Sequence, residues 1–520
     1  MRLGERLLGG VCWSALSRVT GIVVGFVLAP YVLLRVGAEG FGLWSLAAVT
    51  VNYLGLVDLG VSAAYLRTVA FFHARGDQDG LEQAIHTGML FYCGLFAVLT
   101  VPAWWLAPRV AGWLQVPEPL RPLATAILLG NFAILAVRQT TGSYRAVLLG
   151  IQRLGAANGV MTASALLHAL FTVAVLEAGW GLGGLVAEGL GLAVFCAAAN
   201  AWFCRRLVPG LRLIPRRWNG RSLPELVSYG FRVQGAGLAG LVNGQVDKVA
   251  LAVVVGLAAA AHYEIGSKIP LQAANIPEFL LLALVPAAAE LQAKGDAQGV
   301  RKLVLYGSRY LLLLGLPLAA VFGLEAQALL TFWMGPAQWT ADMAHILRVL
   351  TVLWVASLVT APLKMVARGL GAPRAELRAS ASSAALNVVF TTLLTPVFGL
   401  DGALGGTVVA VGLGAAGLLW TVHRSIELRW CEALTTSYLP AVLPAVLSTL
   451  AWVGLVHFLP DPSSRGLALL RLCAAGSVLT AGTLGGSWLL GFRDETDARI
   501  AGRLMAVFGR RTGRAREATS

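Results

Sequence analysis

Residues 228–286 read SYGFRVQGAGLAGLVNGQVDKVALAVVVGLAAAAHYEIGSKIPLQAANIPEFLLLALVP. Two apolar runs overlap this stretch, 225–254 and 262–287, and each is long enough to cross a bilayer, which takes about 20 residues. The stretch nevertheless carries ionisable side chains, namely Arg232, Asp247, Lys248, Glu264, Lys268 and Glu278. Because a charge that faces lipid is costly, such groups mostly line a cavity or a pathway inside the protein. The stretch therefore predicts membrane-spanning helices beside a polar interior.

Polar side chains of the second run recur on one face of the predicted helix. They are Glu264, Lys268, Gln272, Asn275 and Glu278. At about 100° per residue these positions fall within one stripe roughly 120° wide. Two prolines, Pro270 and Pro277, are expected to kink the helix. The stripe predicts a wet or charged neighbour; an ion pair between its first two members, four residues apart, is the alternative.

The composition is that of an all-α integral membrane protein. Of the 520 residues, 57% are hydrophobic and only 13% are charged, whereas soluble proteins carry about 25% charged residues. The net charge of +14 lies in connections between apolar runs, which argues against nucleic-acid binding. Six scattered cysteines and seven dispersed histidines suggest no disulfide framework, metal site or catalytic nucleophile. We therefore predict no catalytic residue, no metal, no cofactor and no enzymatic activity.

Fourteen apolar runs are long enough to span a membrane. They lie near residues 10–34, 42–65, 86–107, 119–140, 156–177, 183–204, 225–254, 262–287, 304–324, 343–364, 376–397, 403–423, 436–458 and 467–491. With this count the connections alternate between a set with 28 arginines and lysines and a set with 6. Since cytoplasmic connections are rich in basic residues, both termini are predicted to be cytoplasmic.

Short patterns recur at a nearly constant offset that equals six spans. The glycine pairs are Gly37 with Gly256, Gly150 with Gly369, and Gly181 with Gly399, and Asp58 precedes Glu278 at nearly the same offset. An even number of spans gives two copies of the same orientation, a parallel repeat. The pattern predicts an N-terminal lobe (1–204), a basic linker (205–224), a C-terminal lobe (225–424), two appended spans (425–492) and a basic tail (493–520). Each lobe would contain six helices, with a cavity between the lobes.

Several motifs resemble one known family. They are LRVGAEGFGLW at 34–44, VDLG at 57–60, Asp247-Lys248, Gly256, Tyr263, LVP at 284–286, Gly150 with Arg153, and GLDGA at 399–403. Together they are similar to the Wzx-like O-antigen and exopolysaccharide flippases of the multidrug/oligosaccharidyl-lipid/polysaccharide (MOP) exporter superfamily. The resemblance implies export of a polyprenyl-diphosphate-linked oligosaccharide across the bacterial cytoplasmic membrane. It also implies contact with membrane lipids, and polysaccharide polymerase and chain-length proteins as partners.

The resemblance further implies charged residues in a central cavity. We assign this role to the positions that are already anomalous for a membrane span: Arg18, Asp58, Arg232, Asp247, Lys248, Lys268 and Glu278. A diphosphate that leaves water needs cationic, hydrogen-bonding partners, and the cations of this set would supply them. Amide and hydroxyl groups suit the sugars, and the candidates are Asn243, Gln272, Asn275 and the segment 380–387. The acids would balance the cations in an empty cavity or carry protons.

Three other functions stay open at this point. A lipid II flippase of the same superfamily would resemble this chain in span count and cationic cavity. A small-molecule antiporter would want an acidic, aromatic cavity instead. A membrane glycosyltransferase or polymerase would act on the same lipid-linked donors, but such enzymes resemble one another in having a sizeable outer loop, and every predicted outer loop is short.

Overall fold

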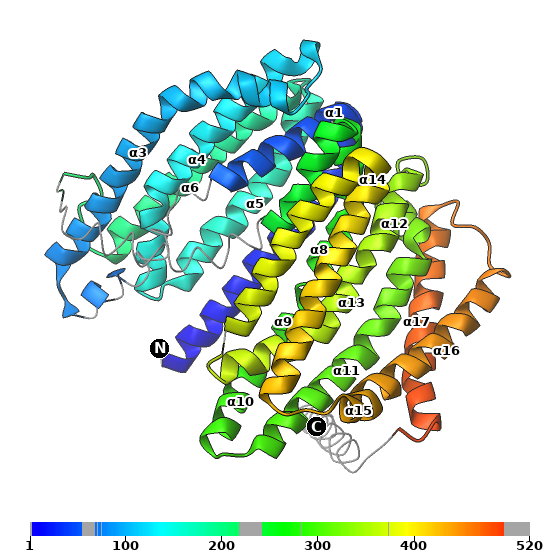
Figure 1. Ribbon diagram of the computed structural model, residues 1–520. Helices are drawn as coiled ribbons and strands as arrows, with labels where there is room; N and C mark the ends of the chain where they lie inside the picture. The colour runs from blue at the N-terminus through cyan, green and yellow to red at the C-terminus, as the bar shows by residue number, and fades with distance from the viewer. Residues whose placement is uncertain are drawn as a thin grey trace, which may run out of the picture. The chain divides into compact units, whose positions relative to one another are not determined.

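The computed structural model describes residues 3–54, 68–69, 71–73, 75–216, 218, 242–281, 283–372 and 374–492. Every regular element in this part of the chain is helical (Figure 1), which confirms the all-α fold class. Ten helices within it are long and apolar enough to cross a membrane. The chain is a multi-pass membrane protein; the count of fourteen spans stays a prediction. Asp58 and Arg232 lie outside the described residues.

Helix α14 (Arg374–Ser425) contains two of the predicted spans, 376–397 and 403–423, and α1 (Leu3–Leu54) contains the span 10–34 and the described part of 42–65. Helix α1 leaves helical geometry at Gly37, with φ 74° and ψ 171°, and α14 does so at Gly399, with φ 57° and ψ −126°. Fifty-two residues of straight helix would be about 78 Å long, far more than a hydrocarbon core of about 30 Å. Since glycine adopts positive φ at no steric cost, the chain can turn at each of these two glycines and continue as a second helix.

The second half of α14 folds back onto its first half. A Cβ atom added at Gly402 would lie 2.2 Å from the carbonyl oxygen of Leu394, and one at Gly406 would lie 2.8 Å from the backbone nitrogen of Thr391. Only glycine permits this backbone approach. The α14 hairpin therefore packs too tightly for any side chain at these two positions.

By their contacts, the residues of the chain form two compact units. The first unit comprises residues 1–267 and 380–411, and the second comprises residues 268–379 and 412–520. The lobes predicted from the repeat follow other boundaries, and they stay a prediction.

In the first unit, four long helices lie side by side (Figure 1). They are α3 (Gln78–Trp113), α4 (Arg121–Gly150), α5 (Leu154–Glu177) and α6 (Gly181–Leu207), with the short helix η2 (Glu118–Leu120) before α4. Tyr92, Phe96 and Phe132 form part of the core between α3 and α4. The rings of Phe96 and Phe132 pack edge to face, with centroids 5.5 Å apart.

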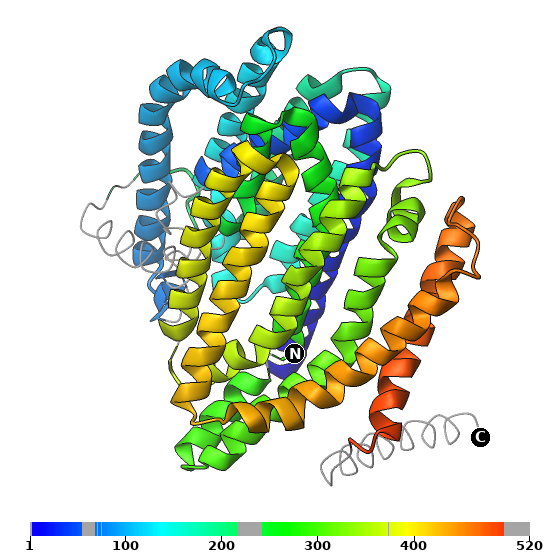
Figure 2. The same cartoon turned by 45° about the vertical axis from the view of Figure 1, so that its right-hand side comes forward.

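In the second unit, the last helices are fastened by a buried carboxylate. The helices are α11 (Ala297–Leu324), α12 (Ala326–Met334), α13 (Ala341–Gly369), α15 (Trp430–Ala433), η3 (Leu434–Tyr438), α16 (Leu439–Val456) and α17 (Arg465–Leu489). Glu325, only 2% exposed, accepts hydrogen bonds from Trp452 Nε1 at 2.9 Å and Arg471 Nε at 2.6 Å. The contact ties α16 and α17, the orange-to-red pair of Figure 2, to the end of α11.

The predicted single helix at 262–287 is wrong in its continuity. The structure has three helices here: α8 (Leu257–Ala273), α9 (Ile276–Leu280) and α10 (Leu284–Ala293). Pro277 has no N–H to donate to the carbonyl of Ala273, one helical turn earlier. The next carbonyl, that of Ala274, accepts a hydrogen bond from Ser357 Oγ on α13. Asn275 therefore lies in a turn, and the polar stripe is interrupted between Gln272 and Glu278.

The repeat has a clear local counterpart at a position that the glycine comparison did not include. Gly76 and Gly295, which are separated by the offset of the repeat, have φ of 69° and 70°. Each precedes an aspartate that caps the next helix: Asp77 Oδ1 accepts from Gly80 N at 2.8 Å, and Asp296 Oδ1 accepts from Gly299 N at 2.7 Å. The same cap at the same offset begins α3 and α11.

Positive φ values recur along the whole chain at this offset. The pairs are Gly37 and Gly256, Gly76 and Gly295, Gln115 and Gly335, Gln152 and Gly371, Gly181 and Gly399, and Gly210 and Glu427. Their separations are nearly the same from the first pair to the last. Such values are rare for residues other than glycine, so six matched pairs support a repeat of the backbone conformation itself.

Candidate functional site

Asp247 is a buried carboxylate held by hydroxyl groups. It lies in a helical segment at 242–254 and is 1% exposed. Tyr263 donates to Asp247 Oδ2 at 2.6 Å, Thr407 donates to the same oxygen at 2.6 Å, and Thr391 donates to Oδ1 at 3.0 Å. Hydrogen bonds to an ionised acceptor are about twice as strong as neutral ones, which offsets part of the cost of burying the charge.

Asn387 joins the two threonines of this site. Its Oδ1 accepts from Thr391 at 2.9 Å and from Thr407 at 3.2 Å, and its Nδ2 donates to the carbonyl oxygen of Asn243 at 3.2 Å. Each hydroxyl has one proton to share between Asp247 and Asn387. The α14 hairpin brings Thr391 and Thr407 together because Gly402 and Gly406 let its halves touch. We call Asp247, Tyr263, Asn387, Thr391 and Thr407 the Asp247 cluster.

Lys248, the next residue, enters a separate ion pair. Its Nζ lies 2.5 Å from Glu264 Oε2, and the Lys248 side chain is 10% exposed. Ser45 Oγ donates to the same carboxylate oxygen at 3.2 Å. Ser45 and Glu264 are 219 residues apart in the sequence, so equivalent positions of the two repeat copies meet here. As expected from helical geometry, Asp247 and Lys248 point to different partners.

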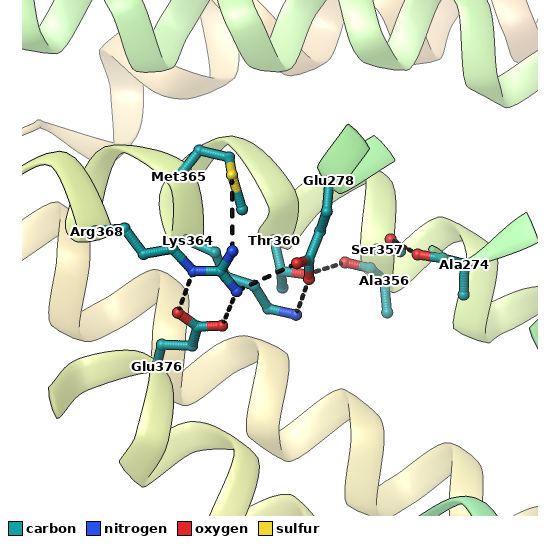
Figure 3. Close-up of polar contacts among 9 residues, drawn as sticks. All are labelled: Ala274, Glu278, Ala356, Ser357, Thr360, Lys364, Met365, Arg368 and Glu376. Atoms are coloured by element: carbon teal, nitrogen blue, oxygen red, sulfur yellow. Dashed lines mark hydrogen bonds and ion pairs between the residues drawn. The ribbon is translucent and has the colours of Figure 1, made fainter. Parts of the chain in front are cut away.

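A second cluster of charged side chains lies in the second unit, near the C-terminal end of α13, and Figure 3 shows it. Glu278 of α9 accepts from Lys364 Nζ at 3.0 Å and from Arg368 Nη2 at 3.2 Å. Arg368 also forms a bidentate pair with Glu376, at 2.8 Å and 2.5 Å. The four side chains, which we call the Glu278 cluster, are 19–38% exposed. They join α9, α13 and the start of α14.

The first repeat copy has its own polar contacts at equivalent positions. Glu188 Oε1 lies 2.8 Å from His168 Nδ1, and Thr172 Oγ1 lies 3.3 Å from the same nitrogen. Shifted by the offset of the repeat, positions 168, 172 and 188 become 387, 391 and 407, so they correspond to three members of the Asp247 cluster. Beside Glu188 is a cavity of about 450 Å³ between α5 and α6, with Phe171 in its wall.

The predicted site residues fall in both units. Asp247, Lys248 and Asn243 lie in the first unit, where Asp247 and Asn243 meet the same α14 hairpin. Arg18 is exposed on α1. The residues assigned to the second unit are Lys268, Gln272, Asn275 and Glu278. A common cavity for the whole set stays a prediction.

Several members of these clusters were missed by the sequence analysis. Tyr263 was quoted only as a family motif, and Thr407 was not noticed, because a hydroxyl in a membrane span carries no charge to attract attention. Lys364 and Arg368 were counted only as basic residues of a connection. Their spacing of four residues, one helical turn, was the available signal that they act together.

The clusters bear on possible ligands. Among the described residues no group of three or more His, Cys, Asp and Glu side chains is placed to hold a metal ion. The Asp247 cluster offers carboxylate, hydroxyl and amide oxygens, the ligand type that hard cations such as alkali ions take. The Glu278 cluster offers guanidinium and ammonium donors, which recognise phosphate or carboxylate anions.

Residues 7–292 match the model of a family described as polysaccharide biosynthesis protein, more than half of the chain. The chain belongs to this family. A membrane protein of Bacillus subtilis described as uncharacterized, EpsK, is 22% identical over 317 residues; the match covers 60% of this chain and 62% of the relative. The chain thus spans less than two thirds of that relative's length.

Two solved structures have a similar fold. The lipid II flippase MurJ, in an inward closed conformation, aligns with a TM-score of 0.68 over 91% of this chain and 98% of the other, at 11% identity. A multidrug resistance MATE family transporter of the MOP superfamily, in an inward-facing conformation, aligns with a TM-score of 0.60 over 79% and 94%, at 16% identity. The predicted resemblance to a polysaccharide biosynthesis family is confirmed by the family model, and the two solved structures confirm the fold.

Proposed function

We propose that the protein is a flippase that moves a polyprenyl-diphosphate-linked oligosaccharide from the inner to the outer leaflet of the bacterial cytoplasmic membrane. Movement would follow alternating access, in which a central site opens to one side at a time. The matching family is described as polysaccharide biosynthesis protein, and the two proteins of similar fold are a flippase and a transporter. Transport rather than catalysis is the activity these relatives support.

The observation that carries the proposal is charge held inside apolar helices. Asp247 and the Lys248–Glu264 pair lie among buried side chains, and each charge is bound to a specific partner. A membrane protein that needed only stability would place apolar side chains there, because burying ionisable groups in a membrane span is expensive. A headgroup with two phosphates and several sugars needs such polar partners when it leaves water.

The orientation is part of the proposal. Both termini and the basic linker at 205–224 would be cytoplasmic, as the excess of arginine in one set of connections indicates. A phosphatase reporter fused after residue 217 should be inactive, and one fused after Asp461 should be active. The opposite activities would refute the orientation while leaving the fold untouched.

The direct test of transport uses purified protein in proteoliposomes. The probe is a polyprenyl-diphosphate-linked oligosaccharide with a fluorophore, and dithionite quenches the fluorophore only in the exposed leaflet. With the flippase, quenching should go beyond the half that protein-free vesicles give; equal quenching in both would count against the proposal. Loss of surface polysaccharide in a deletion strain, restored by the gene, would connect the activity to the cell.

A lipid II flippase is the second candidate. The alignment with MurJ, over 98% of that chain, favours it. Fluorescent lipid II in the same vesicles decides between the two: if lipid II moves and the oligosaccharide lipid does not, the second candidate replaces the first. Polysaccharide polymerase and chain-length proteins are the partners we propose for the first candidate, and co-purification with them tests this.

A further inference from the structure

The Glu278 cluster contains more cationic donors than its carboxylates use. Lys364 and Arg368 together have eight N–H donors. Their contacts with described residues take up Arg368 Nε and Nη2 and one Lys364 hydrogen, while Arg368 Nη1 meets only the Met365 sulfur at 4.0 Å (Figure 3). Thioether sulfur is a weak acceptor. The two cations can therefore accept a further anion, or exchange one that they hold.

The positive charge extends beyond the four clustered side chains. Arg374 and Arg378, in the first turns of α14, are both exposed. Four cations in this short stretch of sequence thus stand against two carboxylates, Glu278 and Glu376. This local surplus of positive charge favours an anion that carries more than one negative charge.

Glu278 is the carboxylate that can leave. Arg368 holds Glu376 by two parallel bonds but Glu278 by one, at 3.2 Å. Glu278 lies on α9, a five-residue helix with a turn on each side. Moving so short a segment breaks few backbone hydrogen bonds, whereas Glu376 is fixed in the long helix α14.

We propose that Lys364 and Arg368 form a binding site for the diphosphate of a lipid headgroup, and that Glu278 occupies this site as a displaceable internal counter-ion. The two cations are four residues apart on α13, so their side chains emerge about 6 Å apart on one face. Each can pair with one phosphate of a diphosphate. Displacement of Glu278 would then free α9, which links substrate arrival to the broken helix α8–α9–α10.

This inference rests on the proposed function for its choice of ligand, and binding can be measured without transport. The probe is farnesyl diphosphate, titrated into full-length protein in detergent and counted by native mass spectrometry. The double variant Lys364→Ala/Arg368→Ala should lower the association constant more than tenfold, since two charge-assisted contacts are lost. Unchanged binding in that variant overturns the proposal.

The variant Glu278→Gln is decisive, because the proposal predicts that it binds farnesyl diphosphate more tightly and not more weakly. If Glu278 competes with the ligand, the variant binds farnesyl diphosphate about tenfold more tightly, because one charged competitor is removed. If Glu278 only holds the helices together, binding weakens or stays the same, and the proposal fails. Should Glu278→Gln not fold, Glu278→Asp, whose shorter side chain reaches the cations less well, should bind more tightly than the unaltered protein.

The matched control is Lys294→Ala. Lys294 is also paired with a glutamate, Glu290, at 2.5 Å, but both side chains are about two thirds exposed. The hydrogen bond from Lys294 lowers the pKa of the Glu290 carboxyl, so the pair is ionised like the cluster. Binding should be unchanged in this variant; an equal loss there would mean unspecific attraction and would overturn the site.

Two further arms separate possible sources of the anion. Phosphatidylglycerol, with one phosphate, should bind at least tenfold more weakly than farnesyl diphosphate; equal binding that depends on the same residues would overturn the diphosphate assignment. Transport in vesicles is the second arm. If the variants change binding as expected but the protein transports no oligosaccharide lipid, the proposed function is refuted and this site stands. If the protein transports the lipid but the variants do not change binding, the site alone is refuted.

Discussion

The two repeat copies place their buried carboxylates on different helices. In the second copy Asp247 accepts hydrogen bonds from Thr391 and Thr407 of the α14 hairpin. In the first copy the position equivalent to Asp247 is Leu28, which is buried and apolar, and the carboxylate is Glu188, at the position equivalent to Thr407. The same three-position pattern is thus kept with a different distribution of charge.

The two repeat copies also differ in how exposed the partners of their carboxylates are. Asn387, Thr391 and Thr407 are at most 3% exposed, whereas the His168 side chain that faces Glu188 is 42% exposed. A carboxylate enclosed by hydroxyl donors is fixed in place, whereas one paired with a half-exposed imidazole is less tightly enclosed. We infer that the second copy holds its carboxyl group in a fixed position and that the first copy does not.

Replacing Asp247 should have the largest effect. Asp247→Leu removes the acceptor of three hydroxyl groups, and Tyr263 retains no other acceptor among the described residues. We expect a loss of about 3 kcal/mol in stability, since unpaired buried donors cost their full desolvation. Thermal unfolding of the purified protein in detergent measures it.

Asp247→Asn is the matched variant, because an amide keeps an accepting oxygen and nearly the same shape. It should unfold close to the temperature of the unaltered protein and yet fail to transport. Full transport by Asp247→Asn would show that the charge itself has no role and that the two copies differ only in packing.

The helix caps allow a test of the repeat that does not involve charge. Gly76→Ala and Gly295→Ala each place a Cβ in the left-handed region, and no atom lies within 4 Å of either new Cβ. The strain should cost about 1–2 kcal/mol at each position. Equal shifts in the thermal unfolding of the two variants would confirm the local equivalence. If only one variant unfolds at a lower temperature, the two positions share their backbone angles but not their contribution to stability.

The sequence predicted the helical membrane fold, the repeat and the family, because apolar length, glycine position and family motifs are all local properties. It failed at 262–287, where Pro277 and the hydrogen bond from Ser357 lie at the break between α8 and α9, and a second break precedes α10. Ser357 is far from Ala274 in the sequence, and no local pattern reveals such a contact. The charged positions Asp247 and Glu278 were found because a charge in a span is conspicuous, while Tyr263 and Thr407, which carry no charge, were not assigned to a site.

Tyr263→Phe should have a smaller effect on stability than Asp247→Leu. It removes one hydrogen bond to Asp247 while Thr391 and Thr407 remain. We expect a loss of about 1 kcal/mol, the usual net value of one hydrogen bond. Combining Tyr263→Phe with Asp247→Leu, which removes the acceptor, in a double-mutant cycle measures the coupling. Additive losses would mean that Tyr263 does not hold the carboxylate.

Glu188→Gln should have the smallest effect of these substitutions. The amide of glutamine keeps an oxygen that can accept a hydrogen bond from His168, so the expected change is about 0.5 kcal/mol. Transport should continue in this variant, in contrast to Asp247→Asn, which makes the same acid-to-amide change in the other copy. If instead Glu188→Gln stops transport and Asp247→Asn does not, the required charge belongs to the first copy, and the cavity of about 450 Å³ beside Glu188 becomes the place to look for the substrate.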